Sequence, residues 1–389
     1  MKIGIDAHNL EGRRTGMGRY LMNLLKYWAD TEPEFILYFK NNVPGDIPKS
    51  GNFRTRILKI ESNALFEHFL LPKAIKKDKI DLFFSPSYIL PLKISKKIMT
   101  AVAVHDVSYA AHPEWFSWQN RILLRRISKK SAQKADIIFT PSEFTKKEIL
   151  KHYKIQAEKI FVVPLAAADK FRQLDKESKT IKEKYGIQEK FIFYIGAIFN
   201  RRFIPECIEA FKQIAKNFPE YQFLISGINY THPFVDIDYI IKKANKDIGR
   251  EAIIRTEYAE EKDLIYLYNS ADLFIWLSSY EGFGLPPLEA LACGTPVITT
   301  KMGSLAEAVG ESAIFVNNPE NTQEIIKAME RVLSDKQLAN ELSKKGLKQA
   351  EKFSWQKTAD VIRVLFCASR TSATKPARWK HCAIAERRS

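Results

Sequence analysis

Short apolar runs alternate with helix-like segments along most of this chain. The first run, Lys2–Asp6, is followed by a loop and then by apolar residues at helical spacing, which predicts a strand, a loop and a helix. Further runs in the first half are typical of strands; they cover residues 35–40, 54–60, 80–84, 100–107, 135–142 and 160–165. Strands that alternate with helices predict an α/β domain with a parallel sheet.

The pattern stops and restarts near the middle of the chain. Residues 168–184 are polar and charged, so we expect the interdomain linker there. Strand-like runs then resume at residues 190–196, 222–227, 252–255, 272–277, 296–300 and 313–316. Because 389 residues are too many for one ordinary core, we expect one domain over 1–170 and a second over 171–352.

The stretch 278–300 combines the end of a strand, a glycine loop, a helix start and a second strand. Gly282 and Gly284 permit a tight turn, and Pro286 and Pro287 suit the first turn of a helix that begins near Leu285. Free backbone N–H groups at such a start favour an anion such as phosphate. The prolines restrict the donors to Phe283, Gly284, Leu285 and Leu288.

Two carboxylates, Glu281 and Glu289, are eight residues apart in this stretch. Their spacing lets them flank a phosphate, one toward a sugar and one toward a ribose, because carboxylates accept hydrogen bonds from hydroxyl groups. The alternative is that Glu289 only caps the helix and Glu281 is a solvated loop charge.

Other candidate residues follow predicted strands. Gly196 precedes the basic pair Arg201 and Arg202, whose guanidinium groups match the oxygens of a diphosphate. His105 ends a strand, at the edge where open α/β sheets bind ligands, although such a histidine is more often structural. The glycines of residues 12–18 form neither a full G-x-G-x-x-G nor a P-loop motif.

Charge and cysteine content restrict the partners and the compartment. The net charge of +16 indicates an anionic partner, either a nucleotide, a nucleic acid or a lipid surface. The four cysteines form no CxxC pair, so we expect neither a zinc site nor a disulfide framework. The first strand begins at once and no run reaches about 20 apolar residues, so we expect a cytoplasmic protein.

One helix and the C-terminus are strongly basic. Residues 121–134 place Ile122, Leu123, Leu124 and Ile127 on one predicted face and six Lys or Arg on the other, with Trp115, Phe116 and Trp118 nearby. This predicts either contact with an anionic membrane or simply a solvated face. Residues 367–389 contain six Lys or Arg and one Glu, so we expect a disordered basic tail.

The segment from Glu281 to Ala290 resembles the Glu-x7-Glu signature of the retaining glycosyltransferases of family 4, which have the GT-B fold. The resemblance implies two Rossmann-like domains that face each other across a cleft, with a helix at 353–366 crossing back to the first domain. It also implies that Glu281 holds hydroxyl groups of the transferred sugar and that Glu289 holds the nucleotide ribose.

Further segments extend the resemblance over residues 1–366. It implies that His105 faces the transferred sugar, that Gly16 and secondarily Gly18 lie near the donor diphosphate, and that Tyr258 lies in the base-binding turn. It also implies that Gly196, Arg201 and Arg202 bind the diphosphate, although Arg202 stands where the family usually has Lys. Gly282, Phe283, Gly284 and Leu285 would complete the donor site.

The resemblance implies transfer of a hexose from a nucleoside-diphosphate sugar to a glycan or lipid-linked acceptor, with retention of configuration and without metal or cofactor. The Asp236-x-Asp238 motif is not expected to hold a metal, because its strand has already ended. Similarity to bacterial mannosyltransferases of surface-polysaccharide assembly favours GDP-mannose. Alternatives are a UDP-sugar glucosyl- or N-acetylhexosaminyltransferase and a nucleotide-sugar epimerase. A nucleic-acid-binding protein is a remote alternative, because base-stacking aromatics cluster only at residues 115–118.

Overall fold

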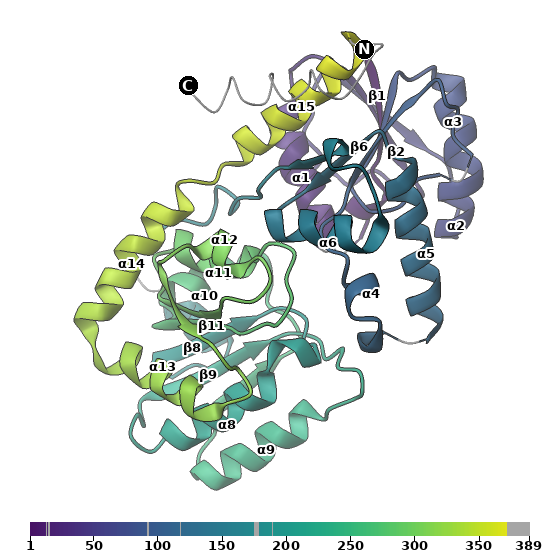
Figure 1. The fold of residues 1–389 in the computed structure, drawn as a ribbon. Coiled ribbons are helices and arrows are strands. Elements are labelled where there is room, and N and C mark those ends of the chain that lie inside the picture. Colours follow the sequence, from purple (N-terminus) through teal and green to yellow (C-terminus); the bar gives the residue numbers. More distant parts are fainter. Residues whose placement is uncertain are drawn as a thin grey trace. The chain divides into compact units, whose positions relative to one another are not determined.

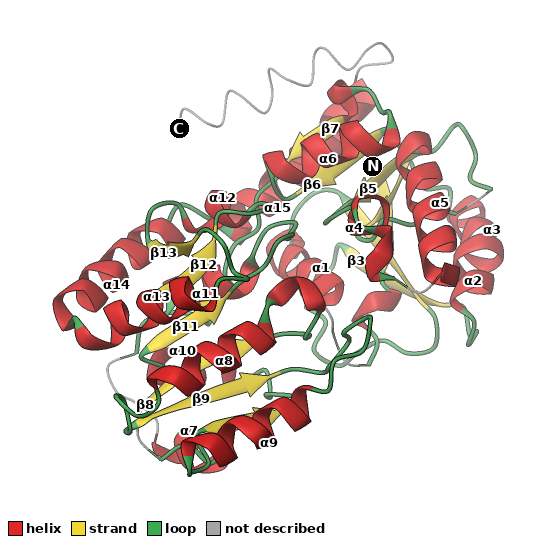
Figure 2. Ribbon diagram, turned by 60° about the horizontal axis from the view of Figure 1, so that its bottom comes forward, coloured by secondary structure: helices red, strands yellow, loops and turns green. Residues whose placement is uncertain are grey.

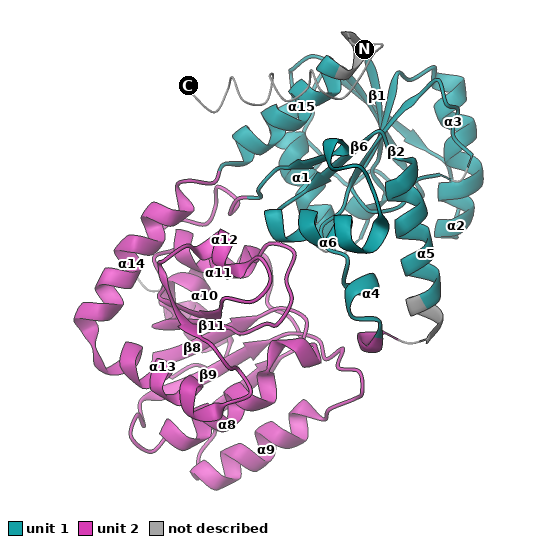
Figure 3. Ribbon diagram, viewed as in Figure 1, with its two compact units in different colours: residues 1–113, 118–165, 354–389 teal, residues 114–117, 166–353 magenta. Residues whose placement is uncertain are grey.

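The computed structural model describes residues 1–12, 14, 16–91, 93–116, 118–174, 179–188 and 190–371, with backbone alone at 118–121 and 369–371 (Figure 1). The chain forms two compact units (Figure 3). Unit 1 contains residues 1–113, 118–165 and 354–389, and unit 2 contains residues 114–117 and 166–353. Most of the predicted basic tail lies outside the described residues.

Unit 1 is built on a seven-stranded parallel sheet with the order β3-β2-β1-β4-β5-β6-β7. The strands are β1 (Lys2–Asp6), β2 (Glu34–Phe39), β3 (Phe53–Ile57), β4 (Leu82–Ser85), β5 (Met99–Ala103), β6 (Ile137–Thr140) and β7 (Ile160–Val162). Ile3 pairs with Phe35 of β2 on one side and with Leu82 of β4 on the other. The strand order therefore reverses beside β1, which makes this edge the switch point of the sheet.

The helices of unit 1 follow the predicted pattern. They are α1 (Gly16–Trp28), α2 (Asn63–Leu65), the π-helical turn η2 (Phe66–Leu70), α3 (Leu71–Asp78), α4 (Ser108–Ala111), α5 (Trp118–Lys134), α6 (Glu143–Tyr153) and α15 (Trp355–Thr371). Short 3-10 turns of unit 1 are η1 (His8–Leu10) and η4 (Ala157–Lys159), and a third, η3 (Pro113–Trp115), continues from unit 1 into residues 114–117 of unit 2. The apolar residues of α1, from Tyr20 to Trp28, are buried at helical spacing.

The last described helix, α15, packs onto the first. The indole Nε1 of Trp28 donates a hydrogen bond of 2.9 Å to the Ala359 carbonyl. The ring of Phe366 lies 5.8 Å from Trp28 and 5.4 Å from Phe84. The structure therefore confirms the prediction that the C-terminal helix returns to the first domain.

Unit 2 repeats this architecture with six parallel strands in the order β10-β9-β8-β11-β12-β13. They are β8 (Lys190–Ile195), β9 (Tyr221–Ser226), β10 (Ile253–Thr256), β11 (Leu273–Trp276), β12 (Val297–Thr300) and β13 (Ala313–Val316). The order reverses between β8 and β11, so the loops after these two strands meet at the switch point.

Helices flank the strands of unit 2 (Figure 2). They are α7 (Lys179–Lys184), α8 (Ile204–Ile214), α9 (Ile237–Ile248), α10 (Leu264–Ser270), α11 (Leu285–Ala292), α12 (Leu305–Val309), α13 (Thr322–Ser334) and α14 (Lys336–Ala350), with the 3-10 turn η5 at Asn200–Arg202. The two Rossmann-like parallel sheets confirm the predicted α/β fold class.

Helix α5 exposes part of its predicted apolar face. Ile122 and Leu123 are 44% and 56% exposed, beside the exposed Arg125, Arg126 and Lys130. The apolar face is therefore not fully covered by unit 1, whereas Leu124 and Ile127 are half-buried. Throughout the described residues, every helix is either too short or too polar to cross a lipid bilayer.

Candidate functional site

The loops after β8 and β11 form a connected site at the switch point of unit 2. They are joined by a backbone hydrogen bond of 3.0 Å from Ser279 N to Arg201 O. The loop after β8 contains Gly196, Arg201 and Arg202, and the loop after β11 contains Glu281 and Gly284. Residues predicted separately from two strand ends are therefore brought together.

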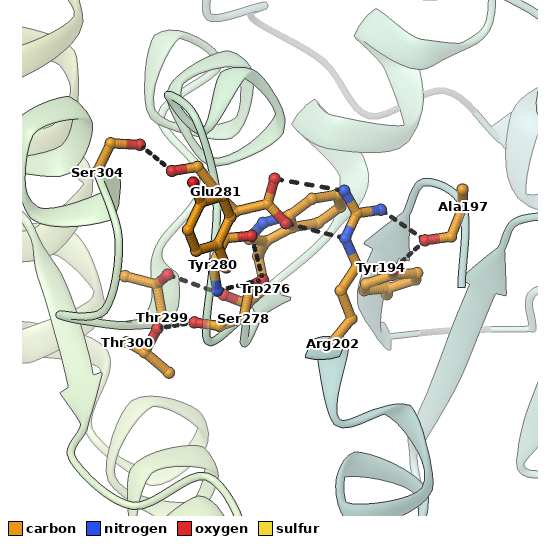
Figure 4. A network of polar contacts seen from close by, with 10 residues as sticks. All are labelled: Tyr194, Ala197, Arg202, Trp276, Ser278, Tyr280, Glu281, Thr299, Thr300 and Ser304. Atoms are coloured by element: carbon orange, nitrogen blue, oxygen red, sulfur yellow. Dashed lines mark hydrogen bonds and ion pairs between the residues drawn. The ribbon is translucent and has the colours of Figure 1, made fainter. Parts of the chain in front are cut away.

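Arg202 and Glu281 form a buried ion pair between these loops (Figure 4). Arg202 Nε donates to Glu281 Oε1 at 3.0 Å and Nη2 donates to Oε2 at 3.5 Å. A third bond, from Nη1 to the Ala197 carbonyl, is 2.5 Å long. Burial by itself would lower the pKa of Arg202, but the charges of Glu281 and Tyr194 and the hydrogen bonds to them together outweigh burial and raise this pKa overall. Arg202 is thus a fixed positive charge whose direction is set by three hydrogen bonds.

An aromatic stack supports the Arg202 guanidinium. Arg202 Cζ lies 4.1 Å from the centre of the Trp276 ring, and Tyr194 stacks on Trp276 with ring centres 5.2 Å apart. Neither aromatic residue was predicted from the sequence, although each stands near the end of a strand that precedes a candidate loop. Stacking of this kind restricts the guanidinium to one plane.

Gly196 has no room for a side chain. Its φ is +139°, and a Cβ atom there would lie 2.7 Å from the Trp276 ring and 3.1 Å from Arg202 Nη1. Gly227, at the end of β9, is equally confined, because its Cβ would lie 2.0 Å from the Gly196 carbonyl oxygen. The absence of side chains at both positions allows the arginine and the tryptophan to meet.

The start of α11 presents unused backbone donors. Among the residues that the structure describes, the N–H groups of Phe283, Gly284 and Leu285 donate no hydrogen bond. The fourth predicted donor, Leu288, is instead used within the turn, since its N–H donates to the Gly284 carbonyl at 3.3 Å. Gly284 has φ +106° and its Cβ would lie 2.8 Å from Leu305 Cδ2, so the turn requires glycine. Three free donors at a helix start can bind an anion.

The backbone of Glu281 is held by residues that the sequence analysis did not identify. Ser304 Oγ donates to the Glu281 carbonyl at 2.8 Å, and Thr300 Oγ1 donates to the Ser278 carbonyl at 2.5 Å (Figure 4). Gly303, with φ +64°, lies so near that its Cβ would be 2.8 Å from Glu281 N. The carboxylate of Glu281 is therefore presented by a rigid loop.

Glu289 differs from its predicted setting at an exposed helix start. It is the fifth residue of α11 and only 6% exposed. Its Oε2 accepts a hydrogen bond of 3.0 Å from the Tyr268 hydroxyl. Tyr268, on α10, is buried as well and was not identified from the sequence. Glu289 therefore has a structural partner in addition to any ligand.

Two further donor-side candidates lie at the same edge of the unit 2 sheet. Arg201 lies over the Phe199 ring, with its Cζ 4.3 Å from the ring centre. Tyr258 follows β10, is 45% exposed, and accepts a hydrogen bond of 3.1 Å from Thr256 Oγ1 at its carbonyl. Because the order is β10-β9-β8-β11, Tyr258 lies two strands away from the loop of Arg202.

The two aspartates of the Asp236-x-Asp238 motif serve other contacts. Asp236 Oδ1 accepts from Tyr239 N at 3.0 Å and caps α9. Asp238 pairs with Arg255 at 2.6 Å. The two carboxylates are directed to separate local partners.

The remaining predicted residues belong to unit 1. His105 follows β5, and its Nε2 lies 3.0 Å from the Pro86 carbonyl oxygen; because a carbonyl only accepts, this nitrogen carries the proton. Burial lowers the pKa of His105. The Tyr20 ring contacts it edge-on at 4.7 Å. The imidazole is thus neutral near pH 7, with Nδ1 as an acceptor.

Gly16 and Gly18 lie in the first turn of α1. A Cβ at Gly18 would lie 2.4 Å from the Asn9 carbonyl oxygen, whereas one at Gly16 would meet nothing within 4 Å. Gly18 therefore has a packing role in the described structure. Gly16 leaves open space beside the helix start.

Comparison with known proteins agrees with this architecture. Residues 14–167 match Glycosyltransferase Family 4, and residues 177–349 match Glycosyl transferases group 1. The O-antigen chain mannosyltransferase B of Escherichia coli is 27% identical over 377 residues, which cover 92% of this chain and 97% of that protein.

Solved structures show the same fold. The sucrose-phosphate synthase of Thermosynechococcus elongatus superposes with a TM-score of 0.73 at 19% identity, covering 95% of this chain and 100% of that one. Anabaena HepE in complex with UDP-glucose gives a TM-score of 0.71 at 16% identity, covering 95% and 100%. Both matched domains and both sheets agree with one assignment: the chain belongs to the group 1 glycosyltransferases, with a family 4 N-terminal domain.

Proposed function

We propose that this glycosyltransferase transfers a hexose from a nucleoside-diphosphate sugar to a glycan or lipid-linked acceptor, with retention of configuration. The observation that carries the proposal is the buried Arg202–Glu281 pair beside three unused N–H groups of the α11 start. A positive charge and free donors suit a diphosphate, and the neighbouring carboxylate suits sugar hydroxyl groups.

In this proposal the diphosphate is stabilised by Arg201, Arg202 and the N–H groups of residues 283–285. Negative charge accumulates on the diphosphate as its bond to the sugar breaks. Fixed positive charges and oriented N–H groups stabilise that charge without having to reorganise. Chelating carboxylates are not needed for this role, so we propose a metal-independent transfer.

Glu281 and Glu289 take two different hydroxyl-binding roles. Glu281 would accept hydrogen bonds from the transferred sugar while Arg202 holds its carboxylate in place. Glu289 would accept a hydrogen bond from the ribose in addition to the one from the Tyr268 hydroxyl. Tyr258 would lie against the base. The Nδ1 atom of neutral His105, in unit 1, is an acceptor suited to a sugar hydroxyl group.

Retention is proposed to proceed by front-side attack. The acceptor hydroxyl attacks the anomeric carbon on the face that the diphosphate leaves, and its proton passes to the leaving phosphate oxygen. We assign no protein nucleophile to the opposite face, so no covalent sugar–protein intermediate is required.

Mannose from GDP-mannose is the first candidate donor, because the relative matched almost end to end is a mannosyltransferase of the O-antigen chain. A UDP-sugar is the second candidate, because HepE superposes well and was solved with UDP-glucose. Thermal shift with GDP, UDP and ADP, followed by turnover of the matching sugar nucleotides, discriminates between them. We expect the largest shift with GDP, and a larger shift with UDP would select the second donor.

We also propose that the enzyme binds peripherally to the inner face of the cell membrane. Exposed Ile122 and Leu123 lie on the same helix as the exposed Arg125, Arg126 and Lys130. Apolar and cationic side chains on one helix favour an interface with anionic lipid. A lipid-linked acceptor would be available at that surface.

Turnover with and without acceptor tests the reaction class. A transferase forms a new glycosidic bond only when acceptor is present, whereas an epimerase converts the sugar nucleotide without one. Arg202→Gln supplies the test variant, because it removes the positive charge but keeps a polar side chain. Transfer that persists unchanged in Arg202→Gln would contradict the proposed diphosphate site.

A further inference from the structure

Asp6, His8 and Glu67 form a buried cluster in unit 1 that the proposed function does not use. Asp6 is the last residue of β1 and is 1% exposed, His8 lies in η1, and Glu67 lies in the π-helical turn η2 and is 7% exposed. His8 Nδ1 lies 2.6 Å from Asp6 Oδ1, and His8 Nε2 lies 3.9 Å from Glu67 Oε1. Three titratable groups thus meet at the switch point of the sheet, where α/β sheets bind ligands.

Glu67 is buried without a hydrogen bond. Within the described chain, no donor lies within hydrogen-bonding distance of its carboxylate, and the contact with His8 Nε2 is too long to be such a bond. Desolvation is the main reason why the pKa of Glu67 is raised to about 7. A buried carboxylate without a donor is destabilising, and π-helical turns are frequent at functional sites. Both features are typical of a binding residue.

The distance of 3.9 Å between His8 Nε2 and Glu67 Oε1 matches a bridge through one hydroxyl group. An oxygen atom can lie at about 2.8 Å from both atoms, beside the line that joins them. A hydroxyl both donates and accepts, so it can bridge the two atoms whichever of them carries the proton. Asp6 fixes the imidazole from the other side, since its Oδ1 also accepts a bond of 3.2 Å from the His8 backbone N–H.

A metal ion fits this arrangement less well. A tetrahedral ion would require nitrogen and oxygen ligands roughly 3.3 Å apart, closer than the observed 3.9 Å. Using Nδ1 instead would break its short bond to Asp6. A hydroxyl requires neither change.

Tyrosine hydroxyls extend the polar surface next to this cluster. Tyr88 follows β4, and its hydroxyl lies 3.2 Å from that of Tyr109. Besides burial, the charges of Asp106 and Glu67 contribute to the raised pKa of Tyr88. Several acceptors and hydroxyls gathered at one sheet edge suit a ligand with several hydroxyl groups.

We propose that Asp6, His8 and Glu67 form a binding site for a hydroxyl group of the acceptor sugar, in which Glu67 and His8 contact the hydroxyl and Asp6 positions His8. This inference rests on the proposed function, because only a transferase requires an acceptor. It places part of acceptor recognition in the first residues after β1.

Steady-state kinetics of Glu67→Gln test the proposal, with an α-mannose-terminated oligosaccharide as the acceptor probe and the sugar nucleotide selected by thermal shift as donor. We expect the acceptor KM to rise at least tenfold, while donor KM and acceptor-independent donor hydrolysis change less than twofold. Glu61→Gln is the matched control, because Glu61 is an exposed carboxylate in the same segment. An unchanged acceptor KM in folded Glu67→Gln would overturn the proposal.

Two further measurements test whether Glu67 is instead a structural carboxylate or a cation ligand. The unfolding temperature of Glu67→Gln should be equal to or higher than that of the wild type, whereas a lower temperature would indicate a structural carboxylate. Calorimetry with zinc chloride and manganese chloride should give no binding that depends on Glu67, and binding lost in Glu67→Gln would assign the site to a cation instead.

Failure of the transferase proposal can be distinguished from failure of the Asp6–His8–Glu67 site. If the wild type neither transfers nor hydrolyses any sugar nucleotide, the transferase proposal fails. Saturation-transfer NMR with the same oligosaccharide then tests the site alone. Binding weakened in Glu67→Gln would support the site, and binding that is absent or equal in both proteins would overturn it.

Discussion

Arg202 Nε lies 3.0 Å from Glu281 Oε1, and neither side chain is more than 12% exposed. The pair joins the loops after β8 and β11, which meet only because these strands are neighbours in the sheet. The charge that would hold the diphosphate and the carboxylate that would hold the sugar therefore orient each other.

Removing either member of this pair should damage both stability and activity. Arg202→Ala leaves Glu281 buried without its partner, which costs on the order of 3 kcal/mol of unfolding free energy. Loss of the positive charge at the diphosphate should reduce kcat by about a hundredfold. Urea unfolding and steady-state kinetics measure the two effects.

The exposed pair of Glu341 and Lys345 is the control for Arg202→Ala. Its side chains are 56% and 54% exposed at a separation of 2.6 Å. Glu341→Gln should leave the unfolding free energy unchanged within measurement error, because an exposed ion pair contributes little to stability. Equal losses in the two variants would show that the Arg202–Glu281 pair has no special role.

Glu289→Gln should weaken binding of the nucleoside diphosphate about tenfold, or about 1.4 kcal/mol. The substitution keeps the side-chain volume but replaces an accepting oxygen by a donor. Glu289→Ala would in addition leave the buried Tyr268 hydroxyl without an acceptor, so it should lose about 1–3 kcal/mol of stability. Calorimetry on folded protein measures the affinity.

Tyrosine variants on α10 test how far the Tyr268 hydroxyl supports Glu289 in nucleotide binding. Tyr268→Phe removes the hydrogen bond to Glu289 and should weaken nucleotide binding less than Glu289→Gln does. Tyr266, on the same helix, is 41% exposed, so Tyr266→Phe should leave the nucleotide affinity unchanged. Unaltered nucleotide affinity in Glu289→Gln would remove Glu289 from the ribose site.

Transfer should persist when divalent cations are chelated. The aspartates of the Asp236-x-Asp238 motif are directed to Tyr239 N and Arg255, while arginines and N–H groups supply positive potential at the proposed diphosphate site. Initial rates with and without EDTA should agree within twofold. Activity that disappears in EDTA and returns with manganese or magnesium would contradict the metal-independent mechanism.

Stability should fall as the pH rises from about 5 to 7. The pKa of Glu67 is raised from 4.5 to about 7, chiefly by desolvation. Burial lowers the pKa of His8, but the charge of Asp6, the hydrogen bond to Asp6 and the charge of Glu67 together raise it overall. Between these pH values the unfolded Glu67 loses its proton while the folded one keeps it. The unfolded state is therefore favoured with rising pH, by at most about 3 kcal/mol.

Urea unfolding at intervals between pH 4.5 and 8 measures this slope. Glu67→Gln should flatten the decline, and the exposed control Glu61→Gln should leave it as in the wild type. His8 contributes in the same direction, so part of the slope should remain in Glu67→Gln. Identical slopes in the wild type and Glu67→Gln would contradict the assignment.

The full-length protein should sediment with vesicles that contain phosphatidylserine and should be released by salt. Each Lys or Arg near such a surface contributes about 1 kcal/mol, and screening removes this contribution. Changing Arg125, Arg126, Lys129 and Lys130 together to Glu should abolish sedimentation, and so should replacing exposed Ile122 and Leu123 with Ser.

A chain that ends at Phe366 tests the basic C-terminus separately. It should still sediment if α5 supplies the main contact. If the α5 variants sediment like the wild type and the shortened chain does not, the tail is the anchor.

Local features of the chain were sufficient to predict the two α/β domains and the principal loops. Apolar runs bounded by loops predicted the strands, because a buried strand requires consecutive apolar residues. Gly284, Pro286 and Pro287 predicted the helix start at Leu285, because their backbone restrictions act within a few residues.

Long-range packing decided which side chains meet and which are buried. The sequence predicted both Arg201 and Arg202 for one site, and the structure pairs Arg202 with Glu281 because Gly196 leaves room for its guanidinium against Trp276. Glu289 is buried by Tyr268, which comes from another helix. Ile122 and Leu123 have helical spacing but remain exposed, because spacing predicts a face and not what covers it. Asp6, His8 and Glu67 meet although about sixty residues separate the first two from the third, since their proximity depends on the path of the chain across the sheet.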